Sequence, residues 1–297
     1  MPTRKILLQT TIVPSEDDWS IGRFGLLAAH LANLKTAGGE RLFEVTARDR
    51  GPVDAADPIL SRLDDSEFDA LWLFAVDTGD GLTSEDCAGV SRFRRAGRGL
   101  MVTRDHMDLG CSVCSLGGLG AAHYFHSKNP DPDEARRRID DTQTSSILWP
   151  NYHSGANGDF QTIAAAGALH PLLVDPDATD GRITMLPAHP HEGAVGAPAD
   201  DPTARVIATG TSQTSGATFN IAIAFEPSAD GGPGLAQSTF HHFADYNWDP
   251  ASGCPSFVTE PPGDGIARSA EARRQIGRYA TNVALWLTGQ STEMAVA

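Results

Sequence analysis

Histidines and carboxylates gather in four short stretches of this 297-residue chain. In chain order, the stretches are Arg104-Asp105-His106 with Asp108, His123 with His126, His189-Pro190-His191-Glu192, and His241-His242 with Asp245. An imidazole paired with a carboxylate can act as a general acid and base near neutral pH. Neutral imidazoles with one carboxylate can instead bind a divalent metal such as zinc and leave a position open for water or a sugar hydroxyl.

The spacing inside two of these stretches indicates which side chains can share a site. In an extended segment, His189 and His191 point to the same side and Glu192 points to the opposite side. In a strand, His241 and His242 point to opposite faces, so only one of them can face a cleft. No H-E-x-x-H or comparable ligand motif is present, so acid–base and metal chemistry both stay open.

These stretches and the aromatic residues near them supply three sets of candidate site residues. The catalytic candidates are Arg104, Asp105, His106 and His242. The substrate-binding candidates are Asp108, His126, Trp149, Tyr152, Asp245 and Tyr246. The metal candidates are His189, His191 and Glu192, which suit a divalent ion such as zinc.

The first stretch follows a predicted strand. Residues 99–102 form an apolar run that is entered through a turn, and charged residues replace the apolar ones directly after it. Ligands bind at the carboxyl ends of strands in open α/β sheets, so we expect the site there. Residues 142–159 have loop composition throughout and are expected to cover it.

The first third of the chain alternates strand and helix signals. Apolar runs predict strands over residues 5–12, 43–48, 68–76 and 99–102. Apolar residues at three- and four-residue spacings predict a helix over residues 20–35, and a capping signal at Thr83 or Ser84 starts another that ends at Gly97. This order with short connections predicts a doubly wound, three-layer α/β sandwich.

The rest of the chain changes character after residue 116. Residues 116–126 would bring His123 and His126 one turn apart if they are helical, and a charged helix is expected from Asp131. Strands are predicted over residues 183–186, 205–210, 219–226 and 235–243, the last two joined by a hairpin loop, and they would add an antiparallel edge. A helix over residues 270–288 closes the fold, so we predict one domain over residues 1–290 and a tail over 291–297.

Composition excludes several function classes. A formal net charge of −15 argues against a nucleic-acid partner, which needs clustered Lys and Arg. No stretch approaches the roughly 20 apolar residues that span a bilayer, and the amino terminus runs straight into a strand, so we expect a cytoplasmic protein without a membrane partner. Four cysteines are too few and too scattered for a disulfide framework.

Several phrases, in order, resemble the ThuA-like (trehalose-utilisation) family of the class I glutamine amidotransferase-like superfamily. They are Lys5-Ile-Leu-Leu, Phe68-Asp-Ala-Leu-Trp-Leu, Leu82-Thr-Ser-Glu-Asp, the run from Arg92 to Val102 that leads up to His106, Leu116-Gly-Gly-Leu-Gly ahead of His126, His170-Pro171, the run from Gly234 to His242, and Leu285-Trp286. The resemblance implies a flavodoxin-like, mostly parallel sheet and a role in carbohydrate metabolism. It departs from the family at Arg98 and at Arg104-Asp105, where the family has glycines, so we expect a divergent subgroup whose ligand differs from that of the family.

The amidotransferase reaction is disfavoured. Amidotransferases of this superfamily carry a cysteine nucleophile on the turn after the central strand, whereas this chain has Asp105 and His106 there and Cys111 several residues later. We therefore predict a sugar-processing hydrolase, lyase or isomerase that acts on a small polyhydroxylated substrate by His/Asp acid–base or metal-assisted chemistry. The alternative is a non-catalytic carbohydrate- or metabolite-binding protein. A small-molecule substrate is the expected partner, and a homo-oligomer stays open.

Overall fold

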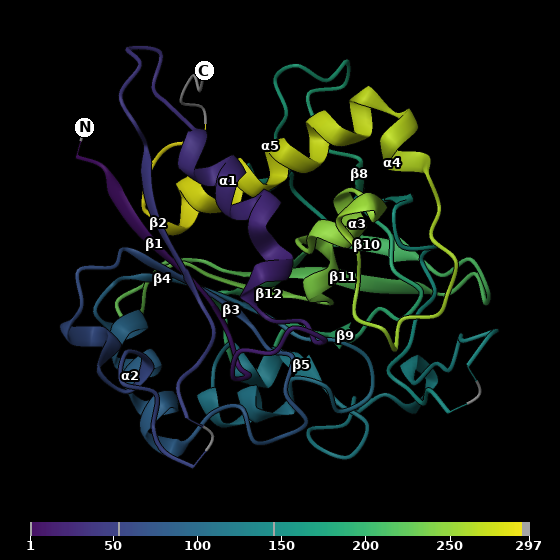
Figure 1. Ribbon diagram of the computed structural model, residues 1–297, viewed down its shortest axis with the longest axis horizontal. Helices are drawn as coiled ribbons and strands as arrows, with labels where there is room; N and C mark the ends of the chain where they lie inside the picture. The colour runs from purple at the N-terminus through teal and green to yellow at the C-terminus, as the bar shows by residue number, and fades with distance from the viewer. Residues whose placement is uncertain (1, 53, 145, 293–297) are drawn as a thin grey trace.

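One eight-stranded sheet organises the fold (Figure 1). The computed structural model describes residues 2–52, 54–144 and 146–292. Along the sheet, the strands are β2 (Phe43–Arg48), β1 (Arg4–Thr10), β3 (Ala70–Phe74), β4 (Gly99–Thr103), β12 (Gly234–Gln237), β11 (Thr218–Phe225), β10 (Ala204–Thr211) and β7 (Ala164–Ala165). The strands from β2 to β12 are parallel, and β11, β10 and β7 add an antiparallel edge. This parallel order is the flavodoxin-like one, so the predicted fold class is confirmed.

Helices and short strands complete the chain. The α-helices are α1 (Gly25–Asn33), α2 (Ser84–Arg95), α3 (Asp245–Trp248), α4 (Gly265–Arg268) and α5 (Ala270–Leu287). The 3-10 helices are η1 (Ile21–Phe24), η2 (Leu60–Asp65), η3 (Cys111–Leu116), η4 (Gly120–Ala122), η5 (Glu134–Arg136), η6 (Pro171–Leu173), η7 (Phe240–His242) and η8 (Pro250–Ser252). Two small antiparallel sheets pair β5 (His123–Tyr124) with β9 (Ala194–Val195) and β6 (Phe160–Thr162) with β8 (Met185–Pro187).

The two faces of the sheet are covered by different helices, because successive side chains of a strand point to opposite faces. Ile6 and Leu8 belong to the core that α1 and α5 cover, together with Val283. Leu7, between them, belongs to the core on the other face, together with Phe93 of α2. Figure 1 shows α1 and α5 above the sheet and α2 below it, which gives the three layers.

The helix starts follow from capping. The Thr83 side chain accepts a hydrogen bond from the Asp86 backbone N–H at 3.2 Å, and the Asp86 carboxylate accepts one from the Thr83 N–H at 3.0 Å. This capping box satisfies two of the free amides at the start of α2. Ser269 caps α5 in a similar way, through the Ala272 N–H at 3.1 Å. Both helices therefore begin within two residues of their predicted starts.

Two predicted elements are wrong in ways that affect the site. Residues 116–126 do not form a helix, since Gly117 and Gly118 adopt positive φ angles that break it. His123 lies in β5 and His126 follows it, so the two do not share a helix face. The strand predicted over residues 235–243 ends at Gln237, and the histidines after it lie in η7.

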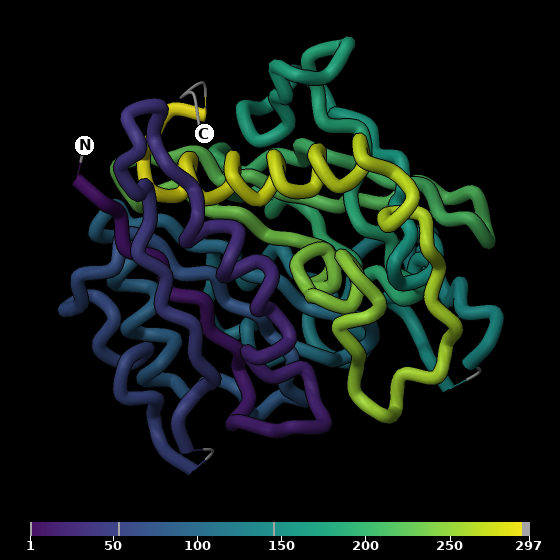
Figure 2. The backbone as a smooth tube through the Cα atoms, turned by 45° about the horizontal axis from the view of Figure 1, so that its top comes forward, coloured from purple at the N-terminus to yellow at the C-terminus, as the bar shows by residue number. Residues whose placement is uncertain are grey.

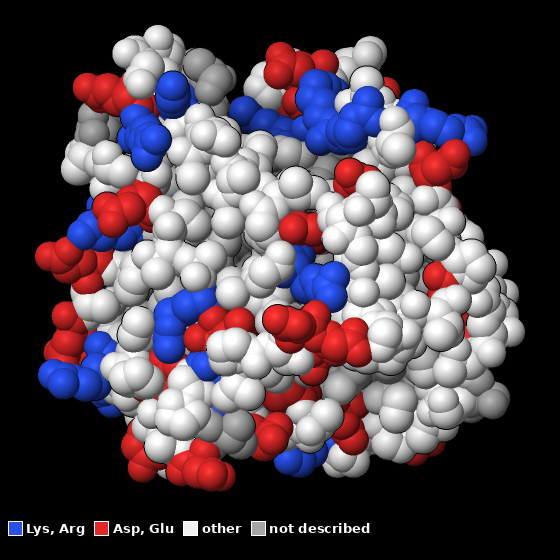
Figure 3. Space-filling model, viewed as in Figure 1, with Lys and Arg blue, Asp and Glu red and all other residues white. Residues whose placement is uncertain are grey.

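Two further predictions on surface elements also need correction. The charged helix expected from Asp131 is reduced to the single turn η5, and the strand expected over residues 183–186 is the shorter β8, displaced by two residues. Acidic side chains are scattered over the face shown in Figure 3, and Lys and Arg form a row along its top, over α4 and α5. Within the described ranges, the structure contains no helix whose length and apolar character would let it cross a bilayer.

Candidate active site

Asp105 lies just after β4, at the carboxyl edge of the parallel strands. Arg104, which precedes it, is fully buried and fixes the turn. Its guanidinium donates to the carbonyl oxygens of Met107, at 2.7 Å, and Tyr124, and lies 4.0 Å from the centre of the Phe125 ring. Arg104, a catalytic candidate by sequence, is therefore directed into the protein and positions Asp105.

Two stacked imidazoles face the Asp105 carboxylate. His189 follows β8 and His241 lies in η7, and their ring centres are 3.6 Å apart with the planes 12° from parallel. His189 Nε2 lies 3.4 Å from Asp105 Oδ1, and His241 Nε2 lies 3.8 Å from Asp105 Oδ2. All three side chains are buried, so water screens their interactions weakly.

Two asparagines behind the stacked rings determine their tautomers. Asn247 Nδ2 donates to a main-chain carbonyl at 3.0 Å and to Asn157 Oδ1 at 2.8 Å, so Asn247 Oδ1 faces His241 Nδ1 at 2.8 Å. Asn157 Oδ1 also lies 2.9 Å from His189 Nδ1. Both Nδ1 atoms must therefore carry the hydrogen, and in the neutral rings both Nε2 atoms direct lone pairs at Asp105.

This arrangement directs the lone pairs of both Nε2 atoms at the Asp105 carboxylate. Burial and the adjacent His241 ring hold the pKa of His189 well below its usual value, so that ring is neutral at pH 7. Burial opposes ionisation of Asp105, but the adjacent His106 imidazole outweighs it and holds the pKa of this carboxyl well below its usual range. Asp105 Oδ1 and His189 Nε2 are buried without a hydrogen-bond partner. A cation between them would remove the repulsion, and one ligand atom from each of Asp105, His189 and His241 lies within 4.8 Å of the others.

Two more histidines extend the cluster toward solvent. His106 Nδ1 lies 3.2 Å from Asp105 Oδ2, and its side chain is 16% exposed. Its ring centre is 5.0 Å from that of His191, which is in turn 5.4 Å from that of His189. Since His106, His189 and His191 also offer ligand atoms within 4.8 Å of one another, His189 belongs to two candidate metal sets.

His191 is the less suitable ligand of these histidines. Its Nε2 atom lies 2.7 Å from Asp141 Oδ2 and 3.8 Å from Glu260 Oε1, so two carboxylates lie against this nitrogen and their charge favours an N–H there. Burial and the neighbouring His106 ring lower the pKa of His191, which favours the neutral ring. The set of Asp105, His189 and His241 therefore fits a divalent metal better.

A pocket of about 370 Å³ opens onto the cluster, a size that suits a small molecule. Its floor contains the histidines and Asp105, and its apolar lining residues are Trp19, Val76, Leu109, Ile147, Phe240, Phe257 and Val258. Two loops that lie side by side in Figure 2, residues 12–20 and 254–260, border it. Asp17 joins them by accepting hydrogen bonds from the Ser256 N–H and hydroxyl at 2.6 and 2.5 Å.

A second polar cluster lies in the interior beside the pocket floor. His242 Nε2 is 3.1 Å from Glu192 Oε1, and both side chains are fully buried. The Glu192 carboxylate also accepts hydrogen bonds from the hydroxyls of Ser154, at 2.9 Å, and Ser238, at 2.6 Å, and from the amide of Gln161. His242 and Glu192, candidates for catalysis and for metal binding, thus pair with each other and do not line the pocket.

All six predicted substrate-binding residues lie outside the described lining of the pocket over Asp105. Asp108 accepts from the Ser127 N–H and hydroxyl, at 2.9 and 2.6 Å, and thereby anchors a loop. The ring centre of His126 is 6.1 Å from that of Trp149. Tyr152 is buried, and its hydroxyl donates to a main-chain carbonyl.

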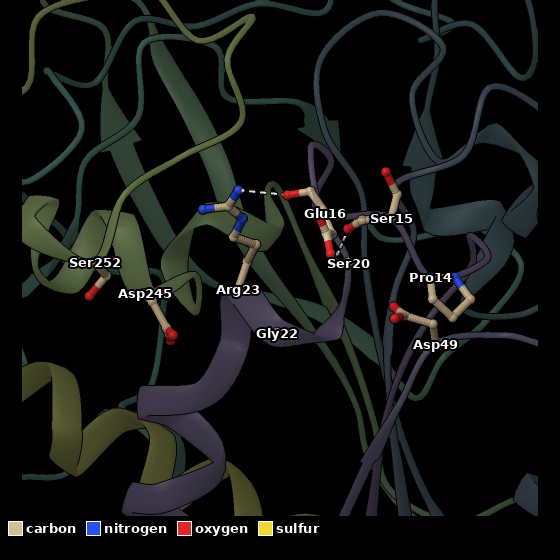
Figure 4. Close-up of a pocket in the computed structure, with 9 residues that line it drawn as sticks. All are labelled: Pro14, Ser15, Glu16, Ser20, Gly22, Arg23, Asp49, Asp245 and Ser252. Atoms are coloured by element: carbon tan, nitrogen blue, oxygen red, sulfur yellow. Dashed lines mark hydrogen bonds between the residues drawn. The ribbon is translucent and has the colours of Figure 1, made fainter.

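The remaining two substrate candidates lie in α3. Asp245 accepts from the N–H groups of Gly25, at 2.9 Å, and Leu26, at 2.8 Å, and so anchors the start of α1. Asp245 also lines a separate surface pocket of about 430 Å³, which Figure 4 shows in close-up. Tyr246 is buried, and burial together with Cys254 raises the pKa of its phenol to about 12.

The cysteines do not supply a nucleophile to the pocket. Burial raises the pKa of Cys111, and it raises those of Cys87 and Cys114 to about 11. None of the cysteines belongs to the described lining of the pocket over Asp105. A thiolate is the reactive form of cysteine, so thiol chemistry is not favoured at this site.

Sequence reasoning missed the two asparagines, and it named His242 where the pocket lining contains His241. The alternation of side chains does indicate that only one of the two faces the pocket, but it does not indicate which. Asn157 and Asn247 lie in loop and single-turn segments, where an amide carries no periodic signal. Asp141 and Glu260 lie far from His191 in the sequence, and only the folded arrangement brings them to its ring.

No protein-family model and no curated protein sequence matches the chain. Among solved structures, it is similar to Agd3, a novel carbohydrate deacetylase, with 10% identity, a TM-score of 0.44 and coverage of 84% of this chain and 30% of that one. It is also similar to the glutaminase domain of Trypanosoma brucei CTPS with bound acivicin, with 13% identity, a TM-score of 0.45 and coverage of 95% of this chain and 94% of that one. Similarities at this level assign neither a family nor an activity.

Proposed function

We propose that the protein is a metal-dependent hydrolase that acts on a small, carbohydrate-derived substrate in the pocket over Asp105. One observation carries the proposal: Asn157 and Asn247 direct the Nε2 lone pairs of His189 and His241 at an ionised carboxylate. Oriented imidazoles with a carboxylate, backed by hydrogen bonds to the other ring nitrogen, are the usual construction of a catalytic zinc site.

The residues around this set have complementary roles in hydrolysis. A divalent ion held by Asp105, His189 and His241 would supply Lewis acidity and an activated water at neutral pH. His106 borders the pocket, and its Nδ1 faces Asp105 at 3.2 Å, so it is placed to accept a proton from the attacking water and return it to the leaving group. His191 would donate hydrogen bonds at the pocket wall.

The carbohydrate part of the proposal rests on the resemblance of the sequence to the ThuA-like family, and membership of that family stays a prediction. Hydrolysis is proposed ahead of lyase or isomerase chemistry because the pocket opens to solvent and a metal beside a histidine base serves water attack directly. A fold shared with other proteins does not by itself indicate this activity.

Zinc binding to the metal-free full chain tests the metal set. We expect one tight site in the wild type, and a loss of affinity of about 100-fold or more in Asp105→Asn and His241→Gln, since each removes one ligand. The matched control is His30→Gln, whose ring lies between Trp248 and Thr281 and outside the pocket. Binding that survives both ligand variants unchanged would refute the metal set.

A measurement of turnover distinguishes an enzyme from a non-catalytic binding protein. The zinc-loaded protein should hydrolyse small carbohydrate derivatives, for which acetylated sugars are one probe, and His106→Ala should lose turnover by about 100-fold or more while it keeps zinc affinity. A protein that binds these sugars without turnover under any divalent metal would instead be the non-catalytic binder.

A further inference from the structure

The charged side chains among the described lining residues of the pocket are all carboxylates. Among its described lining residues, Asp18, Asp105 and Glu260 carry carboxylates, and there is no Lys or Arg. Asp141 adds a further carboxylate directly behind His191. A bound ion would offset the charge of Asp105 at the floor, but the carboxylates of the wall would keep their charge.

The arginine next to Asp105 in the sequence does not supply a positive charge to the pocket. Arg104 precedes Asp105, but its side chain is fully buried and its guanidinium is directed at main-chain carbonyls and at Phe125. Sites for phosphate or carboxylate groups ordinarily provide Arg, Lys or a helix N-terminus. The described pocket provides neither basic side chain, so an anionic substrate group would find no partner on its wall.

Glu260 is the wall carboxylate whose position is best defined. Its Oε1 atom accepts a hydrogen bond from the Thr144 hydroxyl at 3.3 Å and lies 3.8 Å from His191 Nε2. The side chain is 14% exposed, so it is held at the wall and is only partly screened by water. A second negative charge placed beside it would be repelled, whereas an ammonium group would be attracted.

The same loop presents an aromatic ring. Phe257 is 59% exposed at the pocket, although it is a large apolar side chain. Trp19 and Phe240 continue the apolar surface, with their ring centres 5.4 Å apart. Aromatic faces of this kind pack against flat apolar groups, including the C–H face of a sugar ring.

We infer that the pocket selects uncharged or cationic substrates with an apolar face and rejects phosphorylated or carboxylated ones, with Glu260 as the residue that sets this charge preference. The inference rests on the proposed function, because the metal at the floor determines which end of the substrate points inward. The apolar face of the substrate packs on Phe257 and Trp19.

Matched hydroxamates bound to the zinc-loaded full chain test the charge preference, since each carries the same metal-binding group. We expect glycine hydroxamate, a cation, to bind at least as tightly as acetohydroxamate, and succinic monohydroxamate, an anion, to bind about tenfold more weakly or worse. Calorimetry at about 0.15 M salt screens long-range effects. Glu260→Gln should increase the affinity for succinic monohydroxamate about tenfold and leave the affinity for acetohydroxamate unchanged.

Glu134→Gln is the control, because it changes the net charge equally at an 87% exposed side chain that pairs with Arg137. Equal binding of the anionic and neutral probes to the wild type would overturn the inference, and so would an equal gain in both Gln variants. Failure of zinc, or of every hydroxamate, to bind would instead overturn the proposed function.

The aromatic face has its own test. Phe257→Ala should lower the affinity for benzohydroxamate about fivefold and leave the affinity for acetohydroxamate unchanged. Only benzohydroxamate carries a ring that can reach the wall. Equal effects on the two probes, or no effect on either, would remove Phe257 from the inference.

Discussion

Glu192 Oε1 lies 3.1 Å from His242 Nε2 in the protein interior, and each of the two residues directly follows a histidine of the pocket. Glu192 follows His191, and His242 follows His241. Because neighbouring side chains in these segments point in different directions, one residue of each segment faces the pocket and the next faces the other segment. The pair therefore fixes the two histidine-bearing segments against each other.

Glu192→Gln should lower both the free energy of unfolding and the affinity for zinc. The carboxylate accepts hydrogen bonds from Ser154, Ser238 and Gln161 as well as facing His242, and an amide would place a donor among these donors. We expect the free energy of unfolding to fall by about 2–4 kcal/mol and zinc affinity to fall about tenfold.

Urea unfolding and zinc titration of the same samples measure the two effects. Glu67→Gln is the control, since Glu67 pairs with Lys5 at an exposed position and such pairs contribute little to stability. A stability loss without any change in zinc affinity would show that the buried pair does not position the histidines.

The asparagines behind the stacked rings should control metal affinity without touching the metal. Asn157→Ala removes the acceptor of His189 Nδ1, and Asn247→Ala removes that of His241 Nδ1, so each frees a ring to rotate or change tautomer. We expect a loss of zinc affinity of about 10–100-fold in each variant.

Competition with a chelator of known affinity measures this loss, and Asn33→Ala, at an exposed position near the end of α1, is the matched control. If Asn157→Ala and Asn247→Ala bind zinc as tightly as the wild type, the assigned tautomers have no role in ligation.

The parallel half of the sheet was predictable because β1, β3 and β4 contain continuous apolar runs, β2 alternates apolar and polar residues, and the helices carry their own capping and spacing signals. The position of Asp105 followed from the same logic, since the carboxyl ends of parallel strands meet at one edge. The antiparallel edge was also predictable, because the hairpin between β11 and β12 has a loop rich in Gly and Pro.

The choice of His241 over His242 could not be predicted, because it depends on where β12 ends. The strand stops at Gln237 and the two histidines lie in η7, so alternation along an ideal strand does not indicate which of the two rings faces the pocket. The partners Asn157 and Asn247 lie 90 residues apart and meet only through the packing of loops. Such contacts leave no local pattern in the sequence.

Replacement of a cysteine should leave zinc binding and any hydrolytic activity unchanged. Burial raises the pKa of Cys111 and of Cys114, the latter to about 11, so both stay protonated at pH 7 and lie outside the pocket lining. We expect Cys111→Ser to keep zinc affinity and turnover within about twofold of the wild type, as a control variant Cys254→Ser should. A large loss of turnover in Cys111→Ser alone would revive the cysteine-dependent chemistry of the amidotransferases.

The free energy of unfolding of the metal-free protein should decrease in mild acid because of His123. Burial, with Arg104 nearby, lowers the pKa of His123 from 6.5 to about 4. Between these values the unfolded chain binds a proton at this residue and the folded chain does not, so the free energy of unfolding decreases as the pH falls from about 6.5 to about 4. The slope from this residue alone approaches about 1.4 kcal/mol per pH unit, or about 3 kcal/mol in all.

Urea unfolding of the chelator-treated protein at several pH values between 4 and 7 measures the slope. His123→Gln removes the titrating group, so its stability should depend less steeply on pH even if the variant is less stable throughout. If the curves of His123→Gln and the wild type are parallel across this range, His123 is not the buried neutral histidine responsible for the acid sensitivity.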